Sequence, residues 1–194
     1  MASILNIPPE WGLGMMHSIV FAGGIQGPWQ VSSMTAVTGA SLPEVEAIAV
    51  HDGDWEGDLD SRWELRGLPS NIRYSTRNEL SSLRAVQASL GRSECRCAAL
   101  IPIKKSADWW QLAQDERRAI FEEDSRHTAI GLSYLPGVAR KLLHSRDLGE
   151  PFDFLTWFEF SNDDASRFQE LLDRLRASRE WQYVEREVDI RLVR

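Results

Sequence analysis

The chain has 194 residues, of which 22 are Lys or Arg and 29 are Asp or Glu, so its formal net charge is -7. This charge excludes an overall basic surface for nucleic acid or an anionic membrane, and no apolar run approaches the ~20 residues of a spanning helix. The two cysteines, Cys95 and Cys97, are too few and too close together for a disulfide framework. They favour reduced thiols in a cytosolic compartment.

Residues 1–16 are predicted to form an unstructured extension. This segment has no Lys or Arg and contains the helix-breaking pair Pro8-Pro9. It therefore lacks both the charged region and the continuous apolar region of a secretory signal. The prediction is a cytoplasmic location, with a periplasmic one left open.

Residues 17–92 carry weaker patterns and are predicted to be a reduced N-terminal half. Segments 29–37 and 43–51 are typical of strands, although glycines and Pro28 interrupt them. The acidic, glycine-containing segment 51–60 indicates a loop, and 78–89 is consistent with a helix.

Residues 93–194 give a clearer pattern. Segment 94–103 alternates as a strand, and Asp115 and Glu116 open a helix that Pro136 limits. Segments 137–146 and 152–160 are predicted strands. Ser161 and Asp164 have capping-box spacing ahead of a helix with an apolar face, and alternation over 184–192 predicts a half-buried last strand. The apolar helix face consists of Phe168, Leu171, Leu172 and Leu175.

The resulting order, strand–helix–strand–strand–helix–strand, is that of a ferredoxin-like α+β unit with helices on one face of an antiparallel sheet. The N-terminal half is consistent with a reduced second copy of this unit. The other sheet face needs a cover, and a second half-domain, a partner chain or a large ligand each remain open at this point.

Familiar catalytic motifs are absent. The sequence has no glycine-rich phosphate loop, CxxC pair, HExxH or GxSxG. Its four histidines are not spaced for a local multi-histidine metal site. His127 shares a helical face with Ile120, Ile130 and Tyr134, which is typical of a core histidine but also of a proximal haem ligand.

Arg140 has the same strand parity as Val138 and Leu142. It is either a surface cation lying along the sheet or a cation that holds an anion in a dry pocket. Alternate residues from Phe152 to Phe160 form an aromatic stripe that suits either a core or the wall of a flat macrocycle. Lys104, Lys105, Trp109 and Trp110 form a basic and aromatic cluster.

Three runs together resemble the chlorite dismutases, in particular their short, dimeric lineage. They are SRHTAIGLSYLPGVAR at 125–140, HSRDLGEPFDFLTWFE at 144–159 and EWQYVEREVDIRLVR at 180–194. The resemblance implies a homodimeric α+β barrel protein that binds haem b. It makes His127 the axial iron ligand, Glu180 its hydrogen-bond acceptor and Arg140 the catalytic distal cation. The remaining residues that it assigns to haem binding are Tyr74, Lys105, Trp109, Trp110, Leu135, Thr156 and Phe158.

The activity that this resemblance implies is the decomposition of chlorite to chloride and dioxygen. Two alternatives stay open: a coprohaem decarboxylase of the same superfamily, and a non-enzymatic haem-binding protein. Arg140 and the short N-terminal half argue against the decarboxylase, in which the distal arginine position typically carries another residue.

Overall fold

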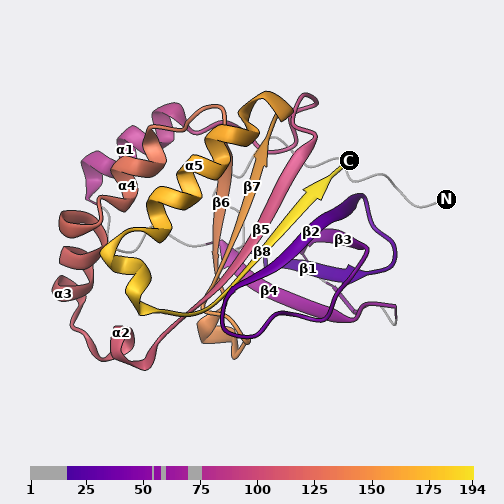
Figure 1. Ribbon diagram of the computed structural model, residues 1–194, viewed down its shortest axis with the longest axis horizontal. Coiled ribbons are helices and arrows are strands. Elements are labelled where there is room, and N and C mark those ends of the chain that lie inside the picture. Colours follow the sequence, from indigo (N-terminus) through magenta and orange to yellow (C-terminus); the bar gives the residue numbers. More distant parts are fainter. Residues whose placement is uncertain (1–16, 54, 58–59, 70–75) are drawn as a thin grey trace.

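The structure, a computed structural model, describes residues 17–53, 55–57, 60–69 and 76–194. Within these residues, eight strands form one closed barrel in the order β1-β3-β2-β8-β5-β7-β6-β4 (Figure 1). The strands are β1 Ile19–Gly24, β2 Trp29–Thr38, β3 Ala47–Asp52, β4 Trp63–Pro69, β5 Cys97–Lys105, β6 Ala139–His144, β7 Phe154–Phe160 and β8 Val184–Val193. The predicted extension 1–16 lies outside the described residues.

The C-terminal half has the predicted element order. Helical segments lie between β5 and β6, and helix α5 (Ala165–Arg176) lies between β7 and β8. Ser161 caps the turn that leads into α5, because its hydroxyl accepts a hydrogen bond from the backbone N–H of Asp164 at 3.3 Å. The four strands lie side by side in the order β8-β5-β7-β6.

The N-terminal half repeats this strand order without most of the helices. Its strands run β4-β1-β3-β2, so in both halves the fourth strand is followed by the first, third and second. Among the described residues, the connections from β1 to β2 and from β3 to β4 hold no helix, and α1 (Arg77–Val86) follows β4. The halves join where β2 pairs with β8 and β4 pairs with β6.

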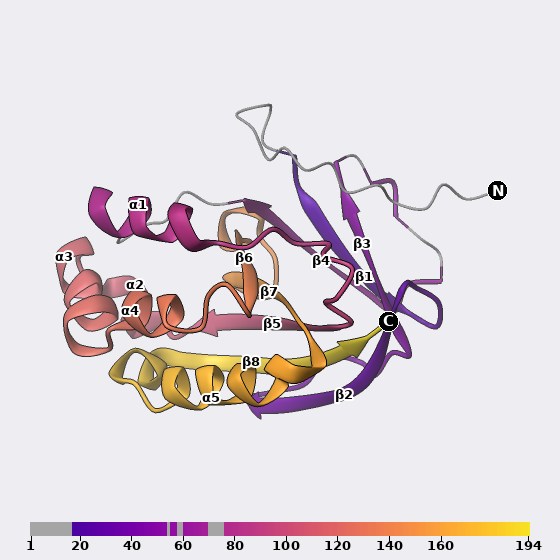
Figure 2. The same ribbon diagram turned by 90° about the horizontal axis from the view of Figure 1, so that it is seen from above.

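Closure of the barrel settles what covers the second face of the C-terminal sheet. That face is the barrel interior, where Leu100, Leu155 and Ile190 pack with Phe21 and Ile48 from the N-terminal half. The opposite face of β5 and β7 packs against α5 (Figure 2). Side chains in this outer core include Ile101, Phe158, Phe168 and Leu172. Of the three expected covers, the structure has the chain's own second half.

The sequence patterns did not predict strands β1 and β4, and the structure gives a physical reason for each. β1 is buried on both faces, so it lacks the alternation that marks a half-buried strand. β4 contains Gly67, where an added Cβ would lie 2.7 Å from the Cβ of Leu143 in β6. The glycine therefore permits close strand approach while weakening the strand signal.

The single helix predicted to open at Asp115 and Glu116 is in fact three short segments, which are α3 (Gln114–Arg118), a π-helix (Ala119–Asp124) and α4 (His127–Leu132). A separate helix, α2 (Ala107–Gln111), precedes them. The predicted helical face through Ile120, His127 and Tyr134 is therefore wrong, because the helix axis changes between them. No helix formed by the described residues is long and apolar enough to cross a bilayer.

Candidate active site

His127 is the first residue of α4, and the backbone just ahead of it is unusual. Arg126 has φ 52 and ψ 36, in the left-handed region that favours glycine. A non-glycine residue there costs about 1–3 kcal/mol, and such strain is concentrated at functional sites. The N–H of Thr128 donates to Oε2 of Glu122 at 2.9 Å, which fixes the first turn of α4.

Glu180 fixes the orientation of the His127 ring. Nδ1 of His127 lies 2.7 Å from Oε2 of Glu180. An ionised carboxylate can only accept, so Nδ1 is the donor and Nε2 is the ring nitrogen left to bind a metal. Glu180 belongs to the short 3₁₀ turn Arg179–Tyr183. Its own N–H donates to the hydroxyl of Ser125 at 2.9 Å, which ties this turn to the segment ahead of His127.

Lys105 completes a buried polar chain. Its Nζ donates to Oε1 of Glu180 at 2.8 Å, and the two side chains are only 3% and 6% exposed. Burial alone would raise the pKa of Glu180, but the charges and hydrogen bonds of Lys105 and His127 lower it to about 2. Glu180 is therefore a carboxylate at any working pH. The ammonium of Lys105 is engaged here; its predicted contact with a haem propionate stays a prediction.

Aromatic rings enclose this polar chain. The ring of Phe121 stacks on His127 with centroids 4.3 Å apart. Lys105 Nζ lies 4.7 Å from the ring centroid of Trp109, which is itself 1% exposed, and 5.5 Å from that of Trp181. Such rings favour a cation and exclude water, which strengthens the hydrogen bonds of the chain.

Trp110 is held beside this group through Asp153. The indole N–H of Trp110 donates to Oδ2 of Asp153 at 3.2 Å, and the backbone N–H of Lys105 donates to the same oxygen at 2.7 Å. The guanidinium of Arg146 lies 3.9 Å from the Trp110 ring centroid. The predicted cluster of Lys105, Trp109 and Trp110 is thus brought together, although Asp153, which joins two of its members, was not predicted.

Arg140 lies on a different surface, the outer face of the sheet. In the register of β6 and β7 it is opposite Phe158, and Leu142 is opposite Thr156. Phe158 and Thr156 are 5% and 9% exposed, whereas Arg140 is half-buried. Burial lowers the pKa of Arg140. No carboxylate of the described residues pairs with its guanidinium, so the cation faces aromatic and aliphatic neighbours.

Two further predicted residues are less informative. Leu135 is half-buried and lies between α4 and β6, after the residue that ends the helix. Tyr74 lies outside the described residues. For both, contact with a haem stays a prediction.

Comparison with protein families identifies the family of the chain. A family model described as chlorite dismutase matches residues 57–194, well over half of the chain. The chain belongs to the chlorite dismutase family. Over 91% of its length, and 99% of the other chain, it is 53% identical to a dimeric chlorite dismutase structure from Nitrobacter winogradskyi, with a TM-score of 0.84.

Two other chlorite dismutases are similar over different extents. The protein from Ideonella dechloratans is 40% identical over 110 residues, which are 56% of this chain and 36% of that relative's length. A mutant enzyme from Candidatus Nitrospira defluvii, in complex with cyanide, has a TM-score of 0.69 over 94% of this chain and 92% of that chain. At 20% identity it supports the fold alone.

The site's donor chemistry fits the haem that a chlorite dismutase implies. Within the described part of the chain, no group of three or more His, Cys, Asp or Glu is placed to hold a metal ion. A single oriented imidazole with a free Nε2, enclosed by aromatic rings, instead suits an iron whose other ligands come from a porphyrin. His127 would hold the iron from one side, with Glu180 as the acceptor that orients it.

Sequence reasoning missed several residues of the C-terminal strand. Glu187 and Asp189 are 0% and 7% exposed, although the alternation of β8 predicted a solvent-facing charged side. Their cover is α5, which supplies Arg176 as an ion partner for both. The alternation itself is correct; a charged side of a strand can be buried when a neighbouring helix brings the opposite charge.

Proposed function

We propose that this protein is a haem b-dependent enzyme that decomposes chlorite to chloride and dioxygen. The observation that carries this proposal is the contrast between two groups. One is an imidazole oriented by a buried carboxylate. The other is a half-buried guanidinium with no carboxylate partner among the described residues. The first group suits a haem iron, and the second suits a small anion.

His127, Glu180 and Lys105 form the binding half of the mechanism. Acceptance of the Nδ1 proton by Glu180 makes the imidazole a stronger donor through Nε2 and fixes its ring orientation. Lys105 keeps Glu180 ionised and in place. Bound haem iron supplies the redox chemistry that converts chlorite into chloride and dioxygen with formation of the O–O bond.

Arg140 forms the substrate half. Its guanidinium attracts the chlorite anion to the apolar sheet face formed with Phe158 and Thr156. Because arginine remains protonated at any working pH, it can hold the anionic substrate and would retain other small anions formed from it beside a bound haem. The low-polarity neighbours strengthen this attraction relative to water.

The finer fold assignment is part of the same proposal. We assign residues 93–194 to a haem-binding ferredoxin-like domain and residues 17–92 to a reduced ferredoxin-like half. The repeated strand order β4-β1-β3-β2 and β8-β5-β7-β6 supports both assignments. Cytoplasmic location is retained as a prediction.

We also propose that the protein is a homodimer in which a second copy covers β2. No Asp, Glu, Lys, Arg or His occurs between Ser18 and Pro43. β2 pairs with β3 only at Trp29 and Gln30, and among the described residues no other strand covers the rest of that edge. Natural edge strands usually carry charges or prolines that prevent association. An uncharged edge in an acidic chain fits self-association, and the 53% identical relative is described as dimeric.

Light scattering at micromolar concentration tests the dimer. The expected mass is about twice that of the chain, and Thr35→Lys, on exposed β2, should shift it towards the monomer because two lysines would meet at a two-fold interface. Ser166→Lys adds the same charge on exposed α5 and should leave the dimer intact. A dimeric Thr35→Lys variant would place the interface elsewhere, and a monomeric wild type would contradict the homodimer itself.

An oxygen electrode tests the catalytic proposal. Chlorite added to the haem-loaded protein should release dioxygen, with chloride as the other product. A coprohaem decarboxylase would instead consume its porphyrin propionates in the presence of peroxide, and a haem-binding protein would show the Soret band without oxygen release. Absence of dioxygen at full haem occupancy would overturn the proposed function.

A further inference from the structure

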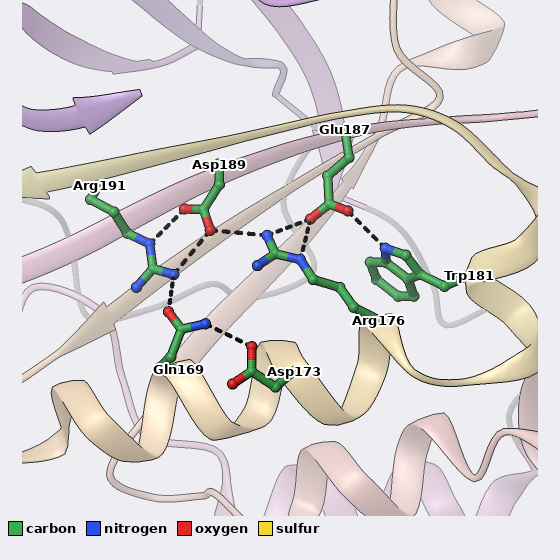
Figure 3. Close-up of polar contacts among 7 residues, drawn as sticks. All are labelled: Gln169, Asp173, Arg176, Trp181, Glu187, Asp189 and Arg191. Carbon is green, nitrogen blue, oxygen red and sulfur yellow. Dashed lines mark hydrogen bonds and ion pairs between the residues drawn. The ribbon is translucent and has the colours of Figure 1, made fainter. Parts of the chain in front are cut away.

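A buried charged network lies between α5 and β8, outside the polar chain of His127, Glu180 and Lys105 (Figure 3). Arg176 donates to Oε1 of Glu187 from Nε at 2.9 Å and from Nη2 at 2.6 Å. Nη2 also reaches Oδ2 of Asp189 at 2.9 Å. Buried ion pairs often add little stability compared with an apolar replacement, and one attested use of such pairs is to fix geometry.

The inner end of this network reaches the candidate active site through Trp181. The indole N–H of Trp181 donates to Oε2 of Glu187 at 2.7 Å (Figure 3). Trp181 directly follows Glu180 in the chain, and its ring is nearly parallel to that of His127, at 18° and 6.4 Å between centroids. Lys105 Nζ lies 5.5 Å from the same ring centroid. Trp181 is therefore beside every member of the polar chain.

We propose that Trp181 and Glu187 are positioning residues for the pair formed by His127 and Glu180. Glu187, held by Arg176, anchors the indole of Trp181, and the anchored indole fixes the turn that carries the Glu180 carboxylate. The alignment of Oε2 of Glu180 on Nδ1 of His127 thereby depends on a carboxylate in β8. The inference rests on the proposed function in one respect, the binding of haem iron by His127.

The turn that carries Glu180 needs such an anchor. It is a five-residue 3₁₀ segment, Arg179–Tyr183, and hydrogen bonds in this kind of helix are poorly aligned. Its outer attachment, the ion pair of Arg179 with Asp124, is exposed and correspondingly weak. Buried bonds to Ser125 and Lys105 hold Glu180 itself, and the bond from Trp181 to the fully buried Glu187 adds an attachment of the turn to β8.

Glu187 divides its two oxygens between the two neighbours. Oε1 accepts from Arg176 and Oε2 accepts from Trp181. Trp181→Phe keeps a flat aromatic ring but removes the only N–H of the side chain, so it separates anchoring from packing. Glu187→Gln keeps an oxygen acceptor for the indole but weakens the hold of Arg176, so a smaller effect in the same direction is expected.

The outer end of the network provides a matched control. Gln169 accepts from Nη2 of Arg191 at 2.8 Å and donates to Asp173 at 2.7 Å, on the exposed side of α5. Gln169→Ala breaks both bonds without touching Trp181 or Glu187. Any loss of stability common to the whole network should appear in this variant too, whereas a change at the iron should not.

The test measures three properties of the haem-loaded variants besides activity. In Trp181→Phe the iron–imidazole stretching frequency of the ferrous protein should fall and the ferric/ferrous potential should rise, because a misaligned Glu180 leaves the imidazole less electron-rich. Haem should dissociate about tenfold faster, the lower end of the range for residues behind a metal ligand. In a crystal structure of the haem-free variant, the distance from Nδ1 to Oε2 should exceed the ~3.2 Å of a hydrogen bond.

The outcomes separate the inference from the proposed function. If Trp181→Phe and Glu187→Gln match the wild type in frequency, potential and dissociation rate while Glu180→Ala does not, the positioning role is wrong and the proposed ligand stands. If Glu180→Ala also matches the wild type, the proximal pair itself is wrong. If Gln169→Ala changes the frequency, the potential and the dissociation rate as much as Trp181→Phe does, the changes reflect a general loss of stability. That result would overturn the inference. Should Trp181→Phe fail to fold, Glu187→Gln decides the question by the same measurements.

Discussion

The surroundings of His127 and of Arg140 differ in whether their charged groups are paired. Beside His127, the buried charges are paired: Nδ1 of His127 contacts Glu180, and Glu180 contacts Lys105. Around Arg140, the neighbours on the sheet are Phe158 and Leu142, with Thr156 as the nearby hydroxyl, and no carboxylate of the described residues pairs with the guanidinium. A charge away from water is costly unless it is paired. The structure therefore pairs the charges on the side that we propose to hold the haem, and the unpaired guanidinium on the other side suits an anion.

This difference separates binding from catalysis. A ligand that must remain bound is best held by groups whose geometry other residues fix in advance. A substrate that must enter and leave is better served by a cation whose partner is the substrate itself. Variants on the two sides should therefore fail differently, the first by losing the cofactor and the second by losing turnover.

His127→Ala should have the largest effect. It removes the imidazole whose Nδ1 lies 2.7 Å from Glu180, so no donor remains for the iron on that side. Stable haem binding should be abolished, as measured by titration of the haem-free protein and the absence of a five-coordinate ferric spectrum. Full occupancy with an unchanged spectrum would contradict the assignment of His127 as the ligand.

Glu180→Ala should have the second largest effect, because it lowers the stability of the protein and also removes the hydrogen-bond acceptor of His127. The change leaves the ammonium of Lys105, 3% exposed, without its carboxylate. Breaking one partner of a buried ion pair costs about 3–5 kcal/mol of unfolding free energy, measurable by urea titration of the haem-free protein. The ferric/ferrous potential of the loaded protein should rise. Glu180→Gln, which retains an acceptor, is the control and should show the smaller loss.

Arg140→Ala should spare the haem and damage the reaction. Loss of one electrostatic contact that acts on the transition state typically costs on the order of 10²–10³ in rate. If the guanidinium mainly retains an anionic product of the first step, the rate loss will be smaller and inactivation earlier, with partial rescue by a hypochlorite scavenger. Normal total turnover without a scavenger would reduce Arg140 to a structural cation.

The same contrast explains how much the sequence could predict. The strands and the last helix of the C-terminal half follow from local patterns, such as the apolar spacing of Phe168, Leu171 and Leu172 behind the Ser161 cap. Barrel closure could not be predicted from local patterns and was implied only by the resemblance to a family, because closure depends on β1, which is buried on both faces and shows no alternation.

The site was predictable only in part. The roles of His127, Glu180 and Arg140 came from the resemblance to a family, since one histidine and one arginine in apolar patterns are ordinary core or surface residues. Trp181 and Glu187 were missed because their contact joins a turn to a strand six residues on, through a helix that supplies Arg176. No periodic pattern records such a contact.

Lys141→Met should have the smallest effect, a change in stability without a change in activity. It is also a control for Arg140→Ala, because it removes the neighbouring cation of β6. The two residues are consecutive in β6, so they point to opposite faces, and Lys141 is opposite Trp157 in the barrel interior.

Burial lowers the pKa of Lys141 to about 8, although Asp52 opposes the shift. A base whose pKa is lower in the folded state destabilises the fold below that pKa, and the penalty disappears as the pH rises towards the ordinary value near 10.5. Because Lys141 is only half-buried, solvent screens part of this penalty. Lys141→Met should therefore raise the unfolding free energy by about 1–2 kcal/mol at pH 7, less than the full shift would give, and the gain should shrink between pH 8 and 10.5. Because the residue faces away from the candidate site, dioxygen release should be unchanged. A gain that is independent of pH would contradict the lowered pKa of Lys141. A loss of turnover matching that of Arg140→Ala would mean that removing any cation of β6 impairs the reaction.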